Sequence, residues 1–521
     1  MASQASASRP EESRATGYAW YVLALLFLVY CLNFIDRQIP AILAEDIKRD
    51  LHLQDQDIGF LYGAAFGVFY SLFGIPLGRL ADNWHRVRLL TVGLTLWSAM
   101  TAASGFAGSG AALGAARIGV GVGEATASPS AYSLLSDWFP RRLRATALAI
   151  YSAGIYVGGG FSLGVGGLIV QRWDRAYPAG GPLGLHGWQA AFLAVGIPGL
   201  LLALWVATLR EPVRGRSDGI PTPPHPRPFG AFVDELIAVV PPFTLIGAGR
   251  RGARALATNV AVAVGLALLV SLLVHLGEPV AQWTAVAIGV YAVTSWASNL
   301  RRHDPPAFAL TVGSRAFWAV VIAYGLNAFI AYAISAWAAT YARRTFGVSP
   351  AEAGLWLGGP AALAGLTGIV GGGRMADWLR ERYPAGRQIV VLFGGIAPLV
   401  PLVIGFTTTS PTLFYVMVAL TGLLAPVALG ASAATTQDLV LPRMRGAATA
   451  VFFLGTTLLG LALGPYLVGR VSTLSGDLGL GVLSTLVVAP IGIIAGIVAY
   501  RLVPAAEASR IERARAAGEA D

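Results

Sequence analysis

Long apolar stretches, separated by short polar loops, run along almost the whole chain. Each stretch is about 20 residues or longer, which is the length that an α-helix needs to cross roughly 30 Å of hydrocarbon. The pattern predicts an all-α membrane protein with fourteen spans, grouped as six, two and six. We expect these spans near residues 18–43, 56–80, 88–107, 110–136, 144–170, 188–209, 255–275, 279–299, 314–342, 351–373, 388–406, 411–436, 445–469 and 479–502.

The polar segments divide the chain into tails, two helical halves and an insertion between the halves. Residues 214–228 are rich in Pro, Arg and Gly, which is typical of a linker, and 229–247 have the pattern of an amphipathic helix at a membrane interface. The charged tail after Arg501 predicts a solvated helix. The expected parts are a cytoplasmic N-terminal tail at 1–17, an N-terminal bundle at 18–209, a cytoplasmic linker at 210–254, a transmembrane hairpin at 255–299, a C-terminal bundle at 314–502 and a cytoplasmic tail at 503–521.

Composition agrees with this picture and removes several classes of protein. Of the 521 residues, 55% are hydrophobic and 12% are charged, whereas soluble domains average about 25% charged residues. Cys31 is the single cysteine and lies in an apolar stretch, which excludes disulfides and a thiolate metal site. We expect no cofactor and no metal. The net charge of +10 lies in loops between apolar stretches, which indicates helix orientation rather than binding of nucleic acid.

Basic residues alternate between the two sides of the predicted membrane domain. One set of loops carries pairs such as Arg86 and Arg88, whereas the opposite loops are poor in basic residues or acidic, as at 45–57. The positive-inside rule places both termini in the cytoplasm. Arg343 and Arg344 break this pattern. All but one of the 37 basic residues are arginine, which is typical of a GC-rich genome, so we expect a bacterial inner (plasma) membrane.

An internal repeat is the strongest regularity in the sequence. Two runs, at 78–82 and 373–377, share Gly, Arg, Ala and Asp in the same places and lie 295 residues apart. A second match relates 140–147 to 442–449. The repeat predicts two related halves, a common construction in transporters. At the offset of 295 two pairs of glycines also match, Gly59 with Gly354 and Gly63 with Gly358.

The G-R-x-A-D run at 78–82, followed by Arg86 and Arg88, resembles a loop signature of the major facilitator superfamily. The resemblance implies a major facilitator fold with two six-helix bundles, twelve core transmembrane helices in all, so that the pair at 255–299 is an insertion. Departures from the signature at Asn83, His85 and Val87 limit what carries over to the Gly, Asp and Arg positions.

The same resemblance implies an inner gate at the loops that hold the two runs. Asp82 is expected to pair near helix starts or with arginines when the inside is shut. The alternative is a solvated loop charge, because surface pairs often contribute little. The candidate gate residues are Gly78, Asp82, Arg86, Arg144 and Asp377.

A sharper resemblance comes from the first and fourth predicted spans. The runs N-F-I-D-R at 33–37 and R-I-G-V-G-V-G-E-A at 117–125 resemble the spinster-type lipid transporters and their bacterial relatives, over most of 18–209. The G-x-G-E-A part is shared with organic-anion/proton symporters. The resemblance implies an amphipathic anionic substrate such as a lysolipid. A small organic anion symporter or a drug exporter of the same superfamily is the alternative.

Ionisable side chains at membrane depth cost several kcal/mol unless they are paired or hydrated, so they are candidates for function. The first half holds Asp36, Arg37, Arg117 and Glu124 at such depth. We expect Asp36 and Glu124 to couple protons, and Arg37, with Asn33 and Arg117, to bind the substrate. The alternative is two permanent structural pairs, Asp36–Arg37 and Arg117–Glu124. Adjacent helical residues point about 100° apart, which disfavours the first pair.

The second half offers neutral polar residues instead of charges. Tyr324, Asn327 and Ser335 form a polar stripe that lines a substrate path or makes hydrogen bonds between helices. The sequence contains no Walker lysine, which excludes ATP-driven transport by this chain alone. No nucleophile–base constellation supports a lipid enzyme, and no charge ring supports a channel. The sequence therefore predicts a monomeric, proton-coupled secondary transporter, not an enzyme, whose partners are protons, its substrate and membrane lipids.

Overall fold

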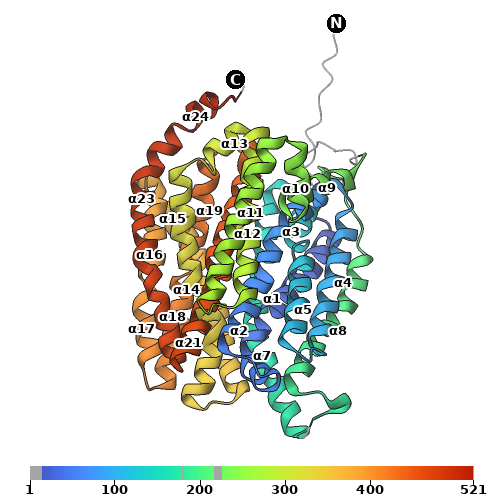
Figure 1. Ribbon diagram of the computed structural model, residues 1–521. Coiled ribbons are helices and arrows are strands. Elements are labelled where there is room, and N and C mark those ends of the chain that lie inside the picture. The colour runs from blue at the N-terminus through green and yellow to red at the C-terminus, as the bar shows by residue number, and fades with distance from the viewer. Residues whose placement is uncertain (1–14, 179, 216–225, 520–521) are drawn as a thin grey trace.

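The computed structural model describes residues 15–178, 180–215 and 226–519. Within these ranges every regular element is a helix and there is no strand (Figure 1). Most of the predicted N-terminal tail and the middle of the predicted Pro-rich linker lie outside the described residues.

The first half of the chain forms one group of helices, called here the N bundle. Its helices match the first six predicted spans, two of which are broken into pairs. In chain order they are α1 (Gly17–Leu51), α2 (Asp55–Tyr62), α3 (Ala64–Asn83), α4 (Arg86–Ser104), α5 (Gly110–Glu124), α6 (Ala127–Trp138), α7 (Arg141–Ala176), the short η1 (Pro182–Gly184) and α8 (Gly187–Ala207).

The second half forms the C bundle, and five helices lie between the two bundles along the chain. The intervening helices are α9 (Pro228–Val239), α10 (Phe243–Arg250), α11 (Ala253–His275), α12 (Val280–His303) and α13 (Pro305–Leu310). The C bundle and tail comprise α14 (Arg315–Phe346), α15 (Pro350–Arg382), α16 (Gly386–Ile396), α17 (Leu399–Thr407), α18 (Pro411–Leu424), α19 (Val427–Asp438), η3 (Pro442–Met444), α20 (Arg445–Thr456), η4 (Thr457–Leu461), α21 (Gly464–Ser475), α22 (Leu478–Leu483), η5 (Ser484–Val488), α23 (Ala489–Ala508) and α24 (Arg510–Ala516).

Eleven helices of the described chain are long and apolar enough to cross a membrane, and the bent pair α9–α10 would make twelve. The predicted count of fourteen includes three segments outside these eleven, which are α4, α5 with α6, and α12. All three are helical. Arg117, Glu124 and several Gly and Ser residues make α5 and α6 less apolar than the other spans. The count of fourteen stays a prediction.

Two predicted helices differ from the structure. The expected single amphipathic helix at 229–247 is two helices that meet at 96°, because Pro241 and Pro242 lack the N–H groups that would continue α9. The C-terminal tail is not simply solvated. Ala514 in α24 is fully buried, and Glu519 forms an ion pair with Arg443 of η3 in the C bundle.

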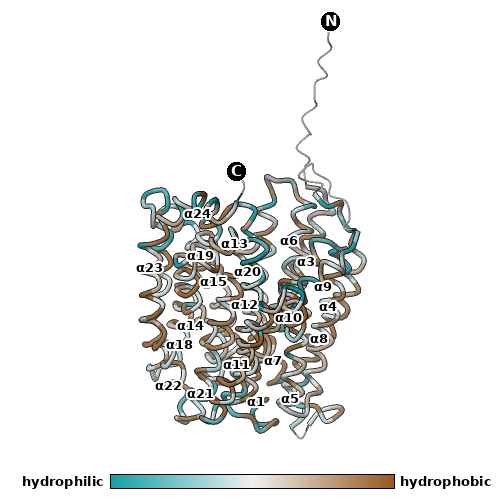
Figure 2. The backbone as a smooth tube through the Cα atoms, turned by 45° about the horizontal axis from the view of Figure 1, so that its top comes forward, coloured by the Kyte–Doolittle hydropathy of each residue, from teal (hydrophilic) through white to brown (hydrophobic). Residues whose placement is uncertain are grey.

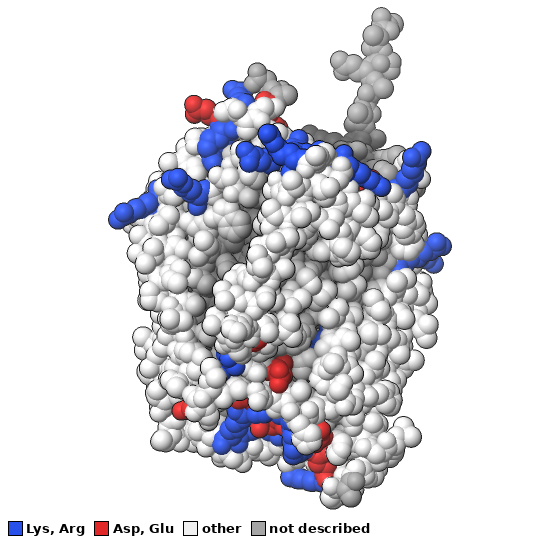
Figure 3. Space-filling view, in the orientation of Figure 1, with Lys and Arg blue, Asp and Glu red and all other residues white. Residues whose placement is uncertain are grey.

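Both described ends of the chain lie on one face of the molecule, called here the terminal face (Figure 1). The opposite, distal face carries the turns between α1 and α2 and between α14 and α15. In this view arginines line the terminal face, whereas the middle of the surface carries few charged side chains (Figure 3). The tube coloured by hydropathy is mostly apolar along the middle of the helices (Figure 2). This distribution is that of a protein embedded in a bilayer.

Two helices are interrupted at equivalent places in the two bundles. The first break, at 125–126, separates α5 from α6, and the second, at 425–426, separates α18 from α19. In the second break Pro426 lacks the N–H of a continuous helix. In the first, the Thr126 hydroxyl donates to the Gly123 carbonyl oxygen at 2.8 Å. Each break exposes backbone carbonyls inside a bundle.

On the distal face the bundles touch at closely packed glycines. A Cβ added to Gly59 would lie 2.6 Å from the Pro465 carbonyl oxygen, and one added to Gly354 would collide with the Leu163 carbonyl oxygen. These two contacts are related by the internal repeat. Gly354 corresponds to Gly59 at the offset of 295, and Pro465 corresponds to Leu163 at the offset of 302, which is the offset of the second sequence match.

A further pair of contacts follows the same two offsets. Gly167 in α7 packs on Pro350 at the start of α15, and Gly469 in α21 packs on Asp55 at the start of α2. The repeat predicted from the sequence is thus also a repeat of contacts, with α7 against α15 and α2 against α21.

Arg343 and Arg344, which break the predicted charge pattern, join the two bundles on this face. Arg343 donates to Asp46 at 2.9 Å, and Arg344 donates to Glu45 at 2.5 Å and to Asp55 at 2.6 Å. The arginines belong to α14 and the acids to α1 and α2. Their position opposite acidic residues explains why they lie on a face that is otherwise poor in basic groups.

The close approach at Gly358 predicts that Gly358→Ala opens the distal face. An added Cβ would lie 3.2 Å from the Gly160 carbonyl carbon and closer still to its oxygen, so we expect a cost of about 1–3 kcal/mol for the closed state. Gly359→Ala is the matched control, because nothing lies within 4 Å of its Cβ. Spin labels at Tyr177 and Leu474, in a background without the native cysteine, should report longer distances for Gly358→Ala alone. Equal distances in both variants would contradict the prediction.

Candidate functional site

α1 and α5 bring four ionisable side chains together inside the N bundle. Asp36 and Arg37 lie in the middle of α1, and Arg117 and Glu124 lie in α5. Asp36, Arg117 and Glu124 are all buried. Glu124 is the last residue of α5, directly before the break at 125–126. The helix break therefore places a carboxylate where the backbone is also irregular.

Arg37 forms the ion pair of this site. Its Nη2 donates to Glu124 Oε2 at 2.9 Å. The rings of Phe34, Phe66 and Tyr70 each lie 4.7 Å from the guanidinium carbon, and aromatic faces attract a cation. The Arg37 side chain is 11% exposed, whereas Glu124 is fully enclosed. An anion arriving at this site would meet the guanidinium before the carboxylate.

Asp36 faces a different neighbourhood from Arg37. Neither of its carboxylate oxygens accepts a hydrogen bond from the described residues, and its side chain is fully buried. The carboxylate lies beside Trp97 and Thr101 of α4. Arg117 Nη1 donates to the backbone oxygen of Asp36 at 3.2 Å, not to the carboxylate. The two buried carboxylates therefore differ, because only Glu124 has a direct cationic partner.

The structural pairs considered from the sequence do not occur among the described ion pairs. Asp36 does not pair with Arg37, and Arg117 interacts with Glu124 only at longer range. Asn33, one turn before Arg37, lies beside the Glu124 carboxylate. The structure brings the four ionisable residues named from the sequence together and pairs Glu124 with Arg37.

The C bundle contributes neutral groups. The Asn327 amide donates to the Ala425 carbonyl oxygen at 3.0 Å, one of the carbonyls exposed by the break at 425–426. Tyr324 stacks on Phe452 with 5.4 Å between ring centroids. Asn327 thus makes the hydrogen bond between helices that the sequence left open as an alternative to lining a substrate path.

Ser335 belongs to a polar cluster that joins the bundles next to the ion pair. Its hydroxyl donates to Gln38 Oε1 at 3.0 Å, and the Tyr62 hydroxyl donates to the same oxygen at 2.5 Å. Gln38 directly follows Arg37 in α1. Sequence reasoning missed Gln38 and Tyr62. Gln38 gave a signal, as a polar residue at membrane depth, but a tyrosine near a helix break gave none.

Asp55 is a second junction that sequence reasoning missed. Besides Arg344 it contacts Lys48 at 2.5 Å and accepts from the Ser472 hydroxyl at 2.6 Å. These partners come from α14, α1 and α21, so one carboxylate holds three helices from both bundles. The sequence signal is weak, because an aspartate at the start of a helix is ordinarily explained by capping and the helix dipole.

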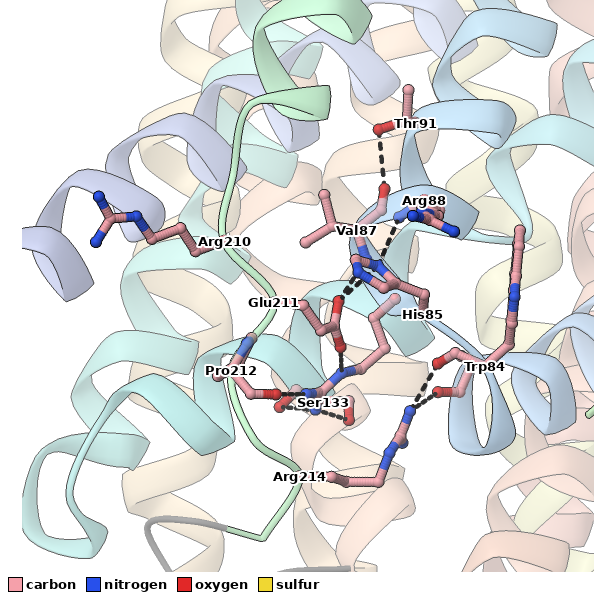
Figure 4. Close-up of polar contacts among 12 residues, drawn as sticks. Trp84, His85, Val87, Arg88, Thr91, Ser133, Arg210, Glu211, Pro212 and Arg214 are labelled. Atoms are coloured by element: carbon pink, nitrogen blue, oxygen red, sulfur yellow. Dashed lines mark hydrogen bonds and ion pairs between the residues drawn. The ribbon is translucent and has the colours of Figure 1, made fainter. Parts of the chain in front are cut away.

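Arg86, predicted for the inner gate, is held inside the N bundle by Ser133 and by two linker residues, Glu211 and Pro212. Figure 4 labels these three partners. The side chain is fully buried and donates to Glu211 at 2.6 Å, to the Ser133 hydroxyl at 2.8 Å and to the Pro212 carbonyl at 2.9 Å. It also forms an ion pair with Asp137. Arg86 therefore anchors the start of the linker to the N bundle and does not make the expected pair with the loop aspartate.

The other candidate gate residues lie on the terminal face or at its edge. Asp82 and Asp377 are exposed. A Cβ added to Gly78 would meet no atom closer than 3.9 Å, and one added to Gly373 would meet nothing within 4 Å. Arg144 lies in the first turn of α7. The two repeated loops are thus not packed tightly, in contrast to the glycines of the distal face.

The fold and the site together define a class of protein. Two helical bundles are related by an internal repeat, their contacts close one face, and a buried ion pair lies beside a polar cluster that connects them. Among the described residues, no group of three or more His, Cys, Asp or Glu side chains could hold a metal ion. These features are those of a secondary transporter with two pseudo-symmetric halves.

The chain belongs to the Major Facilitator Superfamily, whose sequence profile matches residues 26–302 and 320–519. It is 29% identical to an MFS-type efflux pump of Mycolicibacterium smegmatis, over 88% of this chain and 86% of that protein. It is also 29% identical to a probable galactarate/D-glucarate transporter of Bacillus subtilis, over 40% of this chain but only 44% of that protein.

Among solved structures, the chain resembles a bacterial homologue of the human lysosomal transporter spinster, in an inward-facing and unoccupied conformation. The TM-score is 0.68 at 24% identity, and the match covers 96% of this chain and 99% of that one. The likeness supports the fold. The family and the fold are those of transporters, not of enzymes.

The Arg37–Glu124 geometry predicts strong coupling between the two side chains. Arg37→Gln leaves a buried carboxylate unpaired and should lower the free energy of unfolding by about 3–5 kcal/mol. Adding Glu124→Gln should recover much of this loss, because both charges are then absent. Unfolding of the purified single and double variants in detergent measures the coupling. The control is a second double-mutant cycle, of Arg37→Gln with Asp36→Asn. In this cycle the two changes in the free energy of unfolding should be close to additive. Equal coupling in both cycles would contradict the assignment.

Proposed function

We propose that this chain is a proton-coupled secondary transporter for an amphipathic anion, such as a lysolipid, whose anionic head binds Arg37. The observation that carries the proposal is the Arg37–Glu124 pair, in which a partly accessible cation holds a fully enclosed carboxylate. An anionic substrate and Glu124 then compete for the same guanidinium. Competition for one charge is a direct way to link binding of an anion to binding of a proton.

The proposed proton coupling rests on the burial of Glu124, whose side chain is fully enclosed. When the substrate head takes Arg37, the carboxylate loses its counter-charge in a site of low dielectric constant, and a buried carboxylate without a cation favours its protonated form. When the proton leaves, Glu124 pairs with Arg37 again and the anion is released. Asp36, which has no direct cationic partner, is the second proposed proton site on the same helix.

The surroundings of Arg37 favour an amphipathic anion over a polyhydroxylated one. Three aromatic rings surround the guanidinium, and apolar walls suit a hydrocarbon chain better than many hydroxyl groups. The residues proposed to line the substrate path are Asn33, Arg117, Tyr324, Asn327 and Ser335. The second candidate is a polar organic acid, favoured by the similarity to the Bacillus galactarate/D-glucarate transporter. Export of a drug-like compound is favoured by the similarity to the mycobacterial efflux pump.

Transport is proposed to occur by rocking of the N and C bundles. With the arginine-rich terminal face in the cytoplasm of a bacterial cell, as the positive-inside rule indicates, the closed distal face makes the described state inward-facing. Gly78, Asp82, Arg86, Arg144 and Asp377 then form the inner gate only when the terminal face closes. To pair across the gate, Arg86 would have to leave Glu211 and Asp137. Otherwise Arg86 stays in place and anchors the linker beside the gate. We also propose that α11 and α12 are an inserted hairpin and that the chain has fourteen spans and acts as a monomer.

Proton-driven transport in proteoliposomes tests the proposal. Glu124→Gln and Asp36→Asn should each abolish uptake or efflux that is driven by a pH gradient, because neither amide can carry the proton. The matched control is Glu352→Gln, which removes an exposed carboxylate at the start of α15 and should leave transport unchanged. Wild-type pH dependence in both site variants would exclude proton coupling through these carboxylates.

A ligand screen separates the candidate substrates. Thermal unfolding of the purified protein should shift upward with lysophospholipids, and Arg37→Gln should abolish that shift while leaving the variant folded at a lower midpoint. Shifts with glucarate or a hexuronate, without any shift with lysophospholipids, would favour the polar acid instead.

A further inference from the structure

Two seams separate the N and C bundles, and only one of them is covered. The seam between α7 and α15 and the seam between α3 and α20–α21 are equivalent by the internal repeat. Along the second seam, α12 and α9 pack against α3. Figure 1 shows α11 and α12 in front of the line between the two bundles. Among the described helices, none packs across the α7/α15 seam in this way. The inserted helices therefore make the two seams unequal.

Helix α12 lies directly in the covered seam. A Cβ added to Gly289 would lie 3.4 Å from Val68 Cγ1 of α3 and 2.5 Å from Leu458 Cδ2 of η4. Val68 belongs to the N bundle and Leu458 to the C bundle. Ala285 and Ala292, one turn to either side of Gly289, are buried in the same apolar cluster as Val68. The small residues of α12 let this helix fit between side chains of both bundles.

The distal end of the hairpin is bonded to the C bundle through Glu278. Its carboxylate accepts from Arg470 Nε at 3.1 Å and from the Trp283 indole at 3.0 Å, and the Tyr466 hydroxyl donates to it. Arg470 also donates to the Gly277 carbonyl at 2.9 Å. Burial alone would raise the pKa of Glu278, but the bonds from Tyr466 and Trp283 and the charge of Arg470 lower it. The anchor is therefore charged at neutral pH.

A buried glutamine provides a second bond to the C bundle. Gln282 Nε2 donates to the Ala462 carbonyl oxygen at 2.9 Å, just after the π-helical turn η4 (Thr457–Leu461). The preceding carbonyl, of Leu461, is the one against which Gly63 of the N bundle packs. The hairpin thus holds the backbone next to a point where the two bundles meet.

The terminal end of α12 is also bonded to the C bundle. Asp304, which follows α12 directly, accepts from Arg443 Nη1 at 2.6 Å. The contact of α12 with the N bundle at Gly289 is apolar instead, against Val68 of α3. Polar bonds hold a fixed geometry, whereas apolar helix faces can slide past each other in small shear steps.

We propose that the α11–α12 hairpin moves as part of the C bundle, slides over α3 and keeps lipid out of the seam between α3 and α20–α21, so that lipid reaches the bundle boundary at the α7/α15 seam. The proposal rests on the proposed function, because sliding requires that the two bundles move relative to each other during transport.

Two cysteine pairs that share Gly289 test the movement, in a background with Cys31→Ser. Gly289→Cys with Val68→Cys is bridged to the N bundle by a short bifunctional thiosulfonate, and Gly289→Cys with Leu458→Cys is bridged to the C bundle. Bridging to Val68 should slow transport in proteoliposomes by at least about tenfold, reversibly by reduction, because the helix shift is blocked. Bridging to Leu458 should leave the rate within about twofold, because it joins parts that already move together.

The outcomes separate this proposal from the proposed function. Transport by both unbridged pairs shows that the transporter itself is intact. Inhibition by the Leu458 bridge alone, by both bridges or by neither would overturn the assignment of the hairpin to the C bundle. If a cysteine pair abolishes transport before it is bridged, a second variant replaces that test. This variant combines Gly289→Ala, Gln282→Leu and Glu278→Gln. These changes loosen the same bonds and should slow transport, and a wild-type rate would contradict the proposal.

Photolabelling of the unmodified protein tests the seal. Vesicles containing phospholipids with a diazirine on the acyl chain are irradiated, and the adducts are mapped by mass spectrometry. We expect adducts at Phe161 and Leu363, which are highly exposed next to the α7/α15 contact, and on the outer face of α11. Adducts at Val68 or Leu458 at a comparable level would show that lipid enters the covered seam and would overturn this part of the proposal.

Discussion

A guanidinium inside a helix bundle needs a counter-charge, because hydrocarbon and packed side chains solvate neither sign of charge. In this protein Arg37 and Glu124 meet that need for each other at 2.9 Å, and three aromatic rings surround the Arg37 guanidinium. The position of α1 against α5, and the helix break that ends α5 at Glu124, both serve this contact. An anionic ligand that binds Arg37 would leave the Glu124 carboxylate without its counter-charge, and a buried carboxylate without a cation favours its protonated form.

The contacts between the bundles close the distal face of the molecule. Glycines related by the internal repeat let α7 approach α15 and let α2 approach α21 on the distal face. Arg343, Arg344 and Asp55 add charged bonds on that face. On the terminal face the repeated loops have room around their glycines. A scaffold with two equivalent sets of contacts, of which one is closed, suits a rocking motion about the site between them.

Much of this arrangement could be predicted from the sequence, because hydrophobic length and internal repetition are local signals. The apolar stretches predicted the positions of the helices, and the offset of 295 predicted that Gly59 and Gly354 are equivalent positions of the repeat. Contacts between distant segments could not be predicted in the same way. The pairing of Arg37 with Glu124, the bonds of Gln38 with Ser335 and the role of Asp55 all depend on how α1, α5 and α14 are rotated against one another. Sequence periodicity does not specify those rotations.

Proton uptake on substrate binding tests the central claim most directly. The purified protein in weakly buffered detergent solution is mixed with the anion that stabilises it, and a pH-indicating dye follows the change. The account predicts that binding takes protons from solution near neutral pH, and that Glu124→Gln binds the same anion with a smaller uptake. Binding without any proton uptake in the wild type, or the same uptake in Glu124→Gln, would contradict the claim that the anion and Glu124 compete for Arg37.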